Sequence, residues 1–367
     1  MRLLLILLFA LSASAAESGL PAAAPGDVGM NEAVLRSGLA LFEEAVARDE
    51  MRGAVVLVAR KGRVVLHEAI GLRDYERKLP MERDTLFRMA SNTKPVTATA
   101  ILMLAEEGKL SVDDNVRKHL PSFDNYRAGS IKIRHLLSHT SGLRIPVIFF
   151  KPYILPPALQ TEVDRFGEVG ADETPGETYS YNNPGFNTLG AIVEVASGRG
   201  LKEFYRERIY QPLGMKESYN HEPDAPQQRM AVVYRLAKGQ PWKEEWRPGD
   251  EADYPFVRAS GGMISSAADY VRFCQMFLNG GELSGKRLLS PESVQAATTP
   301  KPPGAPAYGF GWGVPAKGLF SHGGSDGTFA WVDKEREIIG IVFTQNPGGA
   351  IPREQFRRVV EASVYDE

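Results

Sequence analysis

Apolar residues follow a helical spacing near the start of the chain and a strand-like pattern directly after it. They recur every three to four residues from 31 to 49, which predicts an amphipathic helix capped by Asn31. Two short apolar runs follow at residues 53–60 and 63–70. Lys61 and Gly62 separate these runs, and a two-residue link that ends in glycine indicates a β-hairpin.

The same kinds of pattern return near the end of the chain. Residues 308–314, 328–332 and 337–344 have the composition of strands, and an amphipathic helix is predicted near 353–364. The region from about 110 to 255 contains mostly helical pieces and long loops. Strands at both ends with helices between them predict an α+β fold. In this fold an antiparallel sheet formed from both chain ends is flanked by helices and carries an inserted, mostly helical subdomain.

The first residues have the three-part pattern of a secretory signal peptide. One basic residue precedes a short apolar run, and small residues follow at a site where cleavage is expected after Ala15 or Ala16. A membrane anchor would need about 20 apolar residues, roughly twice the run found here. We therefore expect a periplasmic or secreted protein. It would have no membrane span after removal of residues 1–16, and a linker over residues 17–30.

Composition limits the partners and the redox chemistry. The chain has 367 residues, of which 43% are hydrophobic, enough for one large core. Its net charge is only −2 and no long basic run occurs, so nucleic acid is not an expected partner. Cys274 is the single cysteine, which excludes an intramolecular disulfide. It lies on the apolar side of a helical pattern, so we expect it in the core.

The most informative polar pattern is S-N-T-K at residues 91–94, directly before a long apolar, helix-like run. Positions three apart on a helix share one face, so the Lys94 amine can reach the Ser91 hydroxyl. Unpaired N–H groups at a helix N-terminus disfavour an ammonium ion, which favours a neutral Lys94 that can accept the serine proton. In isolation, the same pattern could be a helix N-cap followed by an exposed lysine.

Two further motifs accompany this pattern, Y-N-N at residues 181–183 and H-G-G at residues 322–324. With them the chain resembles the serine β-lactamase and penicillin-binding protein superfamily, whose members carry S-x-x-K, Y-x-N and then K-T-G or H-x-G in that order. It looks most like the branch that contains class C β-lactamases, D-alanyl carboxypeptidases, D-aminopeptidases and β-lactamase-like esterases. The similarity runs from about residue 53 to 345 and includes the stretches 135–143 and 259–270.

The resemblance implies the fold deduced above, with the active site in the groove between its parts. It also implies one catalytic domain over residues 31–364, a Ser91 nucleophile that forms an acyl-enzyme, and neither a metal nor another cofactor. Tyr181 would relay a proton together with Lys94, and Asn183 would donate to the substrate carbonyl. The other interpretation places Tyr181 in the core and Asn183 in a turn.

The third motif would line the site from a strand. In the superfamily the residue after the motif's glycine donates its backbone N–H to the oxyanion hole, together with the nucleophile's own N–H. On this chain those residues would be Ser325 and Ser91, while Gly324 would let the backbone approach the substrate closely. The other interpretation of His322, Gly324 and Ser325 is a plain turn at the end of a strand.

Two competing motifs are rejected. Residues 323–327, G-G-S-D-G, match the nucleophile elbow G-x-S-x-G, but no histidine follows Ser325 and the next residues are strand-like rather than helical. His135 and His139 are four apart, a spacing that suits zinc on a helix. However, the motif lacks its glutamate, and a helix stop follows His139. No metal site is therefore predicted.

His322 stands where many β-lactamases and carboxypeptidases of the superfamily carry lysine. Lysine is a fixed cation that can hold a carboxylate, whereas histidine is largely neutral at pH 7. We therefore expect a neutral ester or amide substrate, either a small molecule or a peptide. A D-alanyl carboxypeptidase, a β-lactamase and a catalytically silent receptor are the alternatives, and the oligomeric state is left open.

Two segments have no assigned role in this scheme. Residues 145–157 are aromatic and rich in proline, and they could line an acyl pocket or pack the helical subdomain. Residues 238–258 carry tryptophans among charges, and we expect them to form a surface loop or lid.

Overall fold

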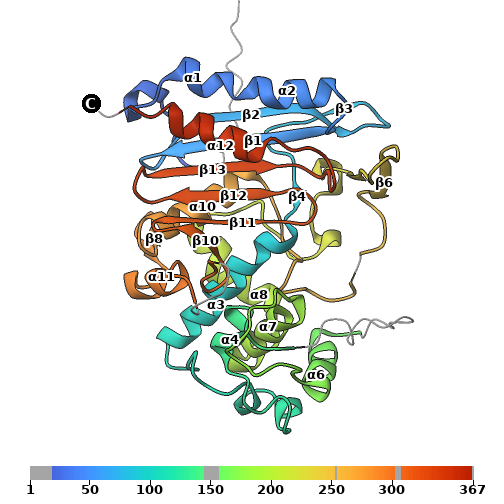
Figure 1. The fold of residues 1–367 in the computed structure, drawn as a ribbon, viewed down its shortest axis with the longest axis vertical. Coiled ribbons are helices and arrows are strands. Elements are labelled where there is room, and N and C mark those ends of the chain that lie inside the picture. Colours follow the sequence, from blue (N-terminus) through green and yellow to red (C-terminus); the bar gives the residue numbers. More distant parts are fainter. Residues whose placement is uncertain (1–18, 144–156, 253, 302–306, 366–367) are drawn as a thin grey trace, which may run out of the picture.

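The two ends of the chain form one antiparallel sheet (Figure 1). The computed structural model describes residues 19–143, 157–252, 254–301 and 307–365. Along the sheet the strands follow the order β10-β11-β12-β13-β1-β2-β3. Their bounds are β1 Gly53–Arg60, β2 Arg63–Asp74, β3 Leu79–Pro80, β10 Gly313–Ala316, β11 Leu319–Gly323, β12 Phe329–Asp333 and β13 Ile338–Phe343. The predicted α+β class and the sheet built from both chain ends are confirmed.

The predicted hairpin forms the centre of this sheet. Lys61 and Gly62 join β1 to β2, and both have positive φ angles (48° and 74°), as a two-residue type I′ turn requires. Strand β13 pairs with the other side of β1 and places Val55 opposite Phe343. All eight residues of β1 are buried. Helices cover both faces of the sheet, which explains why β1 is continuously apolar.

Terminal helices cover one face of the sheet (Figure 1). They are α1 Glu32–Ser37, α2 Leu39–Ala47 and α12 Arg353–Ala362. The single helix predicted over residues 31–49 is divided at Gly38. A Cβ atom there would lie 2.8 Å from the Phe356 ring, so α12 packs directly against the break. The Asn31 side chain accepts a hydrogen bond from Val34 N–H at 3.0 Å, which confirms the predicted cap.

The other α-helices of the described residues lie on the opposite side of the sheet, some of them well away from it (Figure 1). They are α3 Thr93–Glu106, α4 Ile133–Leu137, α6 Leu159–Val169, α7 Asn183–Ser197, α8 Leu201–Tyr205, α9 Gln211–Leu213, α10 Ala267–Leu278 and α11 Pro291–Ala297. Helix α10 packs against β1 and β13, and α3 packs against α7. Cys274 is fully buried in α10, as predicted. Helix α3 therefore lies between the sheet side and the helical part of the molecule.

The segment 308–314 differs from its prediction as one continuous strand. Strand β10 begins only at Gly313. The N–H groups of Phe310 and Gly311 bond to carbonyls at the ends of α11 and α4 instead of to a neighbouring strand. Gly311 has a φ of 79°, which turns the chain away from the sheet.

Short strand pairs lie outside the main sheet. They are β4 Phe87–Arg88 with β7 Ile264–Ser265, β5 Val233–Arg235 with β6 Lys243–Trp246, and β8 Glu282–Leu283 with β9 Lys286–Arg287. The pair β5–β6 lies in the region expected to be mostly helical. The expected surface loop at 238–258 therefore includes a strand, and its Trp246 is only 4% exposed. Packing of that indole among apolar side chains holds this part of the segment against the molecule.

The N-terminal segment lies along the sheet. Ala23 N–H donates to Val64 O and Val64 N–H donates to Pro21 O, both at 2.9 Å, so part of the expected linker extends the edge of β2. The predicted signal peptide and nearly all of residues 145–157 lie outside the described residues. Within the described part of the chain, no helix combines the length and apolarity that crossing a bilayer requires.

Candidate active site

Ser91 lies in a tight 3-10 turn, Ala90–Asn92, that leads directly into α3. Ala90 has a φ of 45°, a conformation that alanine rarely adopts and that the surroundings must hold. Thr93 Oγ1 donates to Ala90 O at 2.7 Å, and Asn92 Nδ2 donates to Thr328 Oγ1 at 2.9 Å. Asn92 occupies the N-cap position of α3, so Ser91 is not the cap of this helix. The turn leaves Ser91 partly exposed.

Lys94 is fully buried in the first turn of α3, and three oxygen atoms surround its amine. The Nζ atom lies 2.9 Å from Ser91 Oγ, 2.8 Å from Asn183 Oδ1 and 2.8 Å from Ser260 O. Burial lowers the pKa of Lys94 well below its usual value, and the charge of Arg258 lowers it further. The neutral amine that this lowered pKa favours has two N–H groups for the oxygens of Asn183 and Ser260 and a lone pair that can take the Ser91 proton. The interpretation of Lys94 as an exposed residue is wrong.

Tyr181 and Asn183 come from the start of α7. Asn182 caps this helix by accepting from Gly185 N–H at 2.8 Å, and Asn183 is its first residue. The Tyr181 side chain is hydrogen-bonded to Ser91, and its ring centre lies 4.8 Å from Lys94 Nζ, although the residue is 39% exposed. Desolvation raises the pKa of Tyr181, so its hydroxyl keeps its proton at neutral pH. Because Asn183 Oδ1 faces the lysine, the amide nitrogen of Asn183 is available as a donor.

The third motif lies at the end of β11, next to the turn that carries Ser91. Gly324 N–H donates to Thr328 O at 2.7 Å, and a Cβ atom on Gly324 would lie only 2.4 Å from Met89 O. Only glycine therefore fits the contact between the end of β11 and the turn that carries Ser91. Ser325 follows at the surface, where its hydroxyl donates to Asp326 Oδ1 at 3.0 Å.

His322 is only 7% exposed and is held by two hydrogen bonds. Its Nδ1 lies 2.9 Å from Gly323 O, and its Nε2 lies 3.0 Å from the Tyr308 hydroxyl. A carbonyl can only accept, so Nδ1 carries the proton and Nε2 accepts from the tyrosine. Burial, with a smaller effect of Lys94, lowers the pKa of His322 to about 3. The imidazole is therefore neutral throughout the physiological pH range.

Sequence reasoning missed three contributors to this site. Ser260 supplies a carbonyl to Lys94, Arg258 supplies a positive charge near it, and Tyr308 holds His322. Ser260 lies in the stretch 259–270, which is one of the stretches similar to the superfamily. However, every residue has a backbone carbonyl, so residue type cannot show that the carbonyl of Ser260 accepts a hydrogen bond from Lys94. Tyr308 was hidden because its segment was expected to be an ordinary strand.

The two rejected motifs have other roles in the structure. The G-G-S-D-G segment joins two antiparallel strands, β11 and β12, so no helix follows Ser325 and the nucleophile-elbow geometry is absent there. His135 Nδ1 accepts from Lys132 N–H, and His139 Nδ1 accepts from Asn182 N–H, both at 3.2 Å. In the described residues, no three His, Cys, Asp or Glu side chains gather as metal ligands would.

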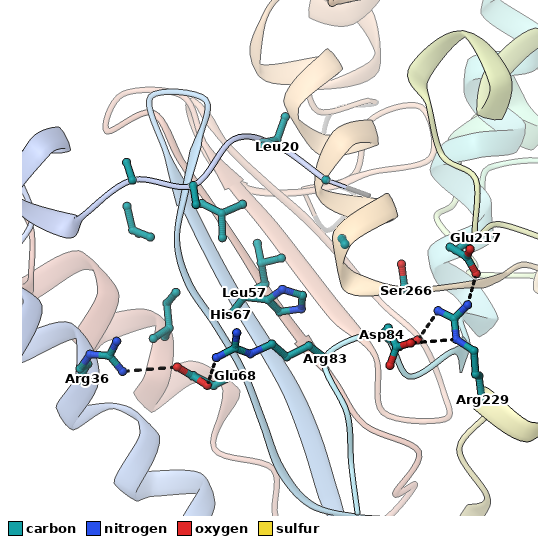
Figure 2. A pocket seen from close by; sticks show the side chains of 17 residues that line it. Leu20, Arg36, Leu57, His67, Glu68, Arg83, Asp84, Glu217, Arg229 and Ser266 are labelled. Carbon is teal, nitrogen blue, oxygen red and sulfur yellow. Dashed lines mark hydrogen bonds and ion pairs between the residues drawn. The ribbon is translucent and has the colours of Figure 1, made fainter. Parts of the chain in front are cut away.

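A cavity of about 550 Å³ lies elsewhere, between the N-terminal segment, β2 and the start of α10 (Figure 2). Its charged side chains form two ion-paired groups, in which Glu68 contacts two arginines and Arg229 contacts two carboxylates. These charges neutralise one another, and none of the predicted site residues lines the cavity. We therefore assign it no part in catalysis.

Replacing Gly324 with alanine is expected to disturb the contact between β11 and the Ser91 turn. The added Cβ atom would meet Thr328 Oγ1 at 2.3 Å and Met89 O at 2.4 Å, so one segment must move. We expect a loss of about 1–3 kcal/mol in the free energy of unfolding, measured by urea denaturation, and slower labelling of Ser91 by a fluorophosphonate. Gly323→Ala is the matched control, because its Cβ atom would have only ordinary contacts at 3.7 Å. Equal effects of the two substitutions would contradict the steric argument.

Comparison with known proteins places this site in a family. A beta-lactamase family model matches residues 40–363. Esterase EstB of Burkholderia gladioli is 32% identical over 320 residues, which cover 75% of this chain and 76% of EstB. Protein Rv1367c of Mycobacterium tuberculosis is also 32% identical, over 323 residues that cover 77% of this chain and 80% of the relative.

Solved structures share the fold. EstCE1, described as a hydrolase with promiscuous acyltransferase activity, has a TM-score of 0.76 at 24% identity and covers 90% of this chain and 98% of its own. A penicillin-binding protein homologue from Caulobacter crescentus has the same TM-score and identity, with coverages of 92% and 99%. Because the family model spans most of the described sheet and helices, the chain belongs to the beta-lactamase family and is a hydrolase with that family's fold.

Proposed function

We propose that this chain is a serine hydrolase that cleaves an ester or amide through an acyl-enzyme on Ser91. The observation that carries the proposal is the 2.9 Å contact between Ser91 Oγ and the buried amine of Lys94. Both influences on the lysine pKa, burial and Arg258, favour the neutral amine, and a neutral amine can take the serine proton. The identity to Esterase EstB supports an ester as one substrate class.

Each step of the reaction then has a group that performs it. Neutral Lys94 takes the Ser91 proton as Oγ attacks the substrate carbonyl, and the backbone N–H groups of Ser91 and Ser325 bind the oxyanion. The leaving group departs with that proton, which passes from Lys94 through the Tyr181 hydroxyl, while Asn183 donates to the substrate. Water attacks the acyl-enzyme, and its proton returns to Ser91 by the same route. No metal or cofactor takes part.

The neutral His322 favours an uncharged substrate, small or peptide-like, because the fixed cation of the K-T-G motif is missing at this position. A D-alanyl carboxypeptidase or β-lactamase is the second candidate. It is favoured by Arg258, a cation close enough to Lys94 to lower the pKa of that residue.

The signal-peptide pattern of residues 1–16 supports a location in the periplasm or outside the cell.

A substrate panel under burst conditions tests the proposal. We expect a burst of p-nitrophenol from a p-nitrophenyl ester, equal to the enzyme concentration, followed by slower turnover, as an accumulating acyl-enzyme produces. D-amino-acid amides and nitrocefin, measured beside the ester, separate esterase, peptidase and β-lactamase activity. Acylation without turnover on every substrate would instead identify a silent receptor, and no acylation at all would contradict the proposal.

Exchanging His322 for lysine is expected to shift the substrate preference. The lysine removes the acceptor of the Tyr308 hydroxyl and adds a cation near Lys94, so kcat/KM for neutral esters should fall. Relative binding of a carboxylate-bearing β-lactam should improve by only about 1 kcal/mol, because the burial and the Lys94 charge that lower the pKa of His322 also oppose a charged lysine at this position. His322→Gln, which adds no charge, is the control. If the wild type already prefers nitrocefin and lysine changes neither ratio, the inference to neutral substrates fails.

A further inference from the structure

His139 binds the backbone on both sides of Tyr181. It is fully buried just after α4 and has a φ of 57°. Its carbonyl oxygen accepts from Ser180 N–H at 2.8 Å, and its imidazole Nδ1 accepts from Asn182 N–H at 3.2 Å. One residue from a distant part of the sequence therefore holds the two peptide groups that flank the proposed proton relay.

The imidazole also packs against the Tyr181 ring itself. The two ring centres are 4.2 Å apart with a tilt of 38°, closer than the 6.4 Å that separates Tyr181 from Tyr308 or from His322. The ring centres of Tyr308 and Phe186 lie 4.8 Å and 5.0 Å from that of His139. Tyr181 is 39% exposed, and among the ring contacts of the described residues the one with His139 is the nearest, so His139 supports one face of the Tyr181 ring.

The protonation state of His139 allows its Nδ1 to act as a permanent hydrogen-bond acceptor. Nδ1 accepts from a backbone N–H, so the ring proton of the neutral imidazole lies on Nε2. Burial, Lys94 and His322 all lower the pKa of His139, so the ring stays neutral and the bond to Asn182 persists.

Two local costs accompany this arrangement. The left-handed backbone at His139 is unfavourable for a residue with a side chain, and its Nε2 has no hydrogen-bond partner among the described residues. Costs of this kind persist where the surrounding structure gains from the residue's placement, and they gather at functional sites.

We propose that His139 is a positioning residue that holds the Tyr181 hydroxyl at its hydrogen bond to Ser91 and the Tyr181 ring beside Lys94. The inference rests on the proposed function, in which Tyr181 relays a proton. His139 touches neither the nucleophile nor the substrate in this scheme. It acts through the segment 180–182 and through the face of the Tyr181 ring.

Two substitutions separate the contacts. In His139→Asn the side-chain oxygen occupies the position of Nδ1 and can still accept from Asn182, and asparagine tolerates the left-handed backbone, but the ring contact is lost. In His139→Phe the ring remains and the acceptor is lost. We expect each variant to lower kcat for a p-nitrophenyl ester roughly 10-fold to 100-fold with little change in KM, because a displaced catalytic group costs about that much. His135→Asn is the matched control, since His135 also accepts a backbone N–H but belongs to another contact.

A double-mutant cycle with Tyr181→Phe gives the decisive readout. If His139 acts through the Tyr181 hydroxyl, His139→Asn should cause no further loss of kcat once that hydroxyl is gone. A full additional loss in the Tyr181→Phe background would overturn the proposal. So would a lower thermal midpoint with unchanged kcat of the folded enzyme, which would make His139 merely structural. If Tyr181→Phe alone loses no activity, the proposed proton relay is wrong, and that failure is distinct from additivity in the cycle.

Discussion

Ser91→Ala should reduce kcat for an activated ester by about 10³-fold or more, because the acylation step loses its attacking atom. The structure places Ser91 Oγ 2.9 Å from the buried Lys94 amine, and among the described residues Ser91 supplies the one hydroxyl that is hydrogen-bonded to that amine. Steady-state turnover and the amplitude of the burst measure the effect. A fluorophosphonate should label the wild type once, on the peptide that contains Ser91, and should not label the variant.

A second serine at a helix N-terminus controls for structural effects of this change. Ser290 caps α11 by accepting from Ser293 N–H at 3.1 Å. Ser290→Ala should therefore cost about 1 kcal/mol of stability, measured by urea unfolding, and leave ester turnover intact. Ester hydrolysis retained by the Ser91 variant would point to a different nucleophile and would remove the basis of the proposed function.

Replacing Lys94 is expected to be nearly as damaging. Both Lys94→Met and Lys94→Arg should lower kcat by about 10²-fold to 10⁴-fold, the range that a positioned general base contributes. Methionine has no base. Arginine carries a positive charge and holds its proton at all working pH values, so it cannot take the proton of Ser91. An arginine variant with near wild-type turnover would show that charge, not proton transfer, is what Lys94 supplies.

The pH dependence of kcat/KM should reflect the protonation of Lys94. Activity needs neutral Lys94, so kcat/KM should fall as the pH drops through the lysine pKa, which burial and Arg258 hold well below its usual value. Removing the neighbouring charge in Arg258→Gln should raise the pKa of Lys94 and move this acid limb to higher pH. His322 cannot produce a limb near neutrality, because its pKa is lowered to about 3. An acid limb that stays in place in the Arg258 variant would contradict the assignment to Lys94.

The free energy of unfolding should also depend on pH, because His322 is buried in the folded chain. The pKa of His322 is about 3 in the folded chain, against about 6.5 for a free side chain. Below about pH 6.5 the unfolded chain takes up a proton that the folded chain does not, so this contribution is full above that pH and declines as the pH falls toward 3.

Local pattern was sufficient for most of the elements and for the contact between Ser91 and Lys94. The hairpin at Lys61 and Gly62 and the cap at Asn31 depend on residues only a few positions apart, so the sequence predicts them directly. Ser91 and Lys94 lie one helical turn apart, so their contact also needs no distant segment. Periodicity further identified strands at both chain ends, and a sheet built from both follows because each has an apolar face to bury.

Distant contacts decided the rest of the site. The carbonyl of Ser260 reaches Lys94 from 166 positions away, and no side-chain chemistry in the sequence marks that oxygen as an acceptor. The Tyr308 hydroxyl meets His322 in a segment whose next N–H groups bond to the ends of α11 and α4. The division of the first helix at Gly38 coincides with the close packing of α12 against that glycine. Short-range geometry in the sequence by itself therefore determined the contact between Ser91 and Lys94 and the order of most elements. Tertiary packing decided the charge state of Lys94 and His322, because desolvation depends on what the whole chain brings around a side chain.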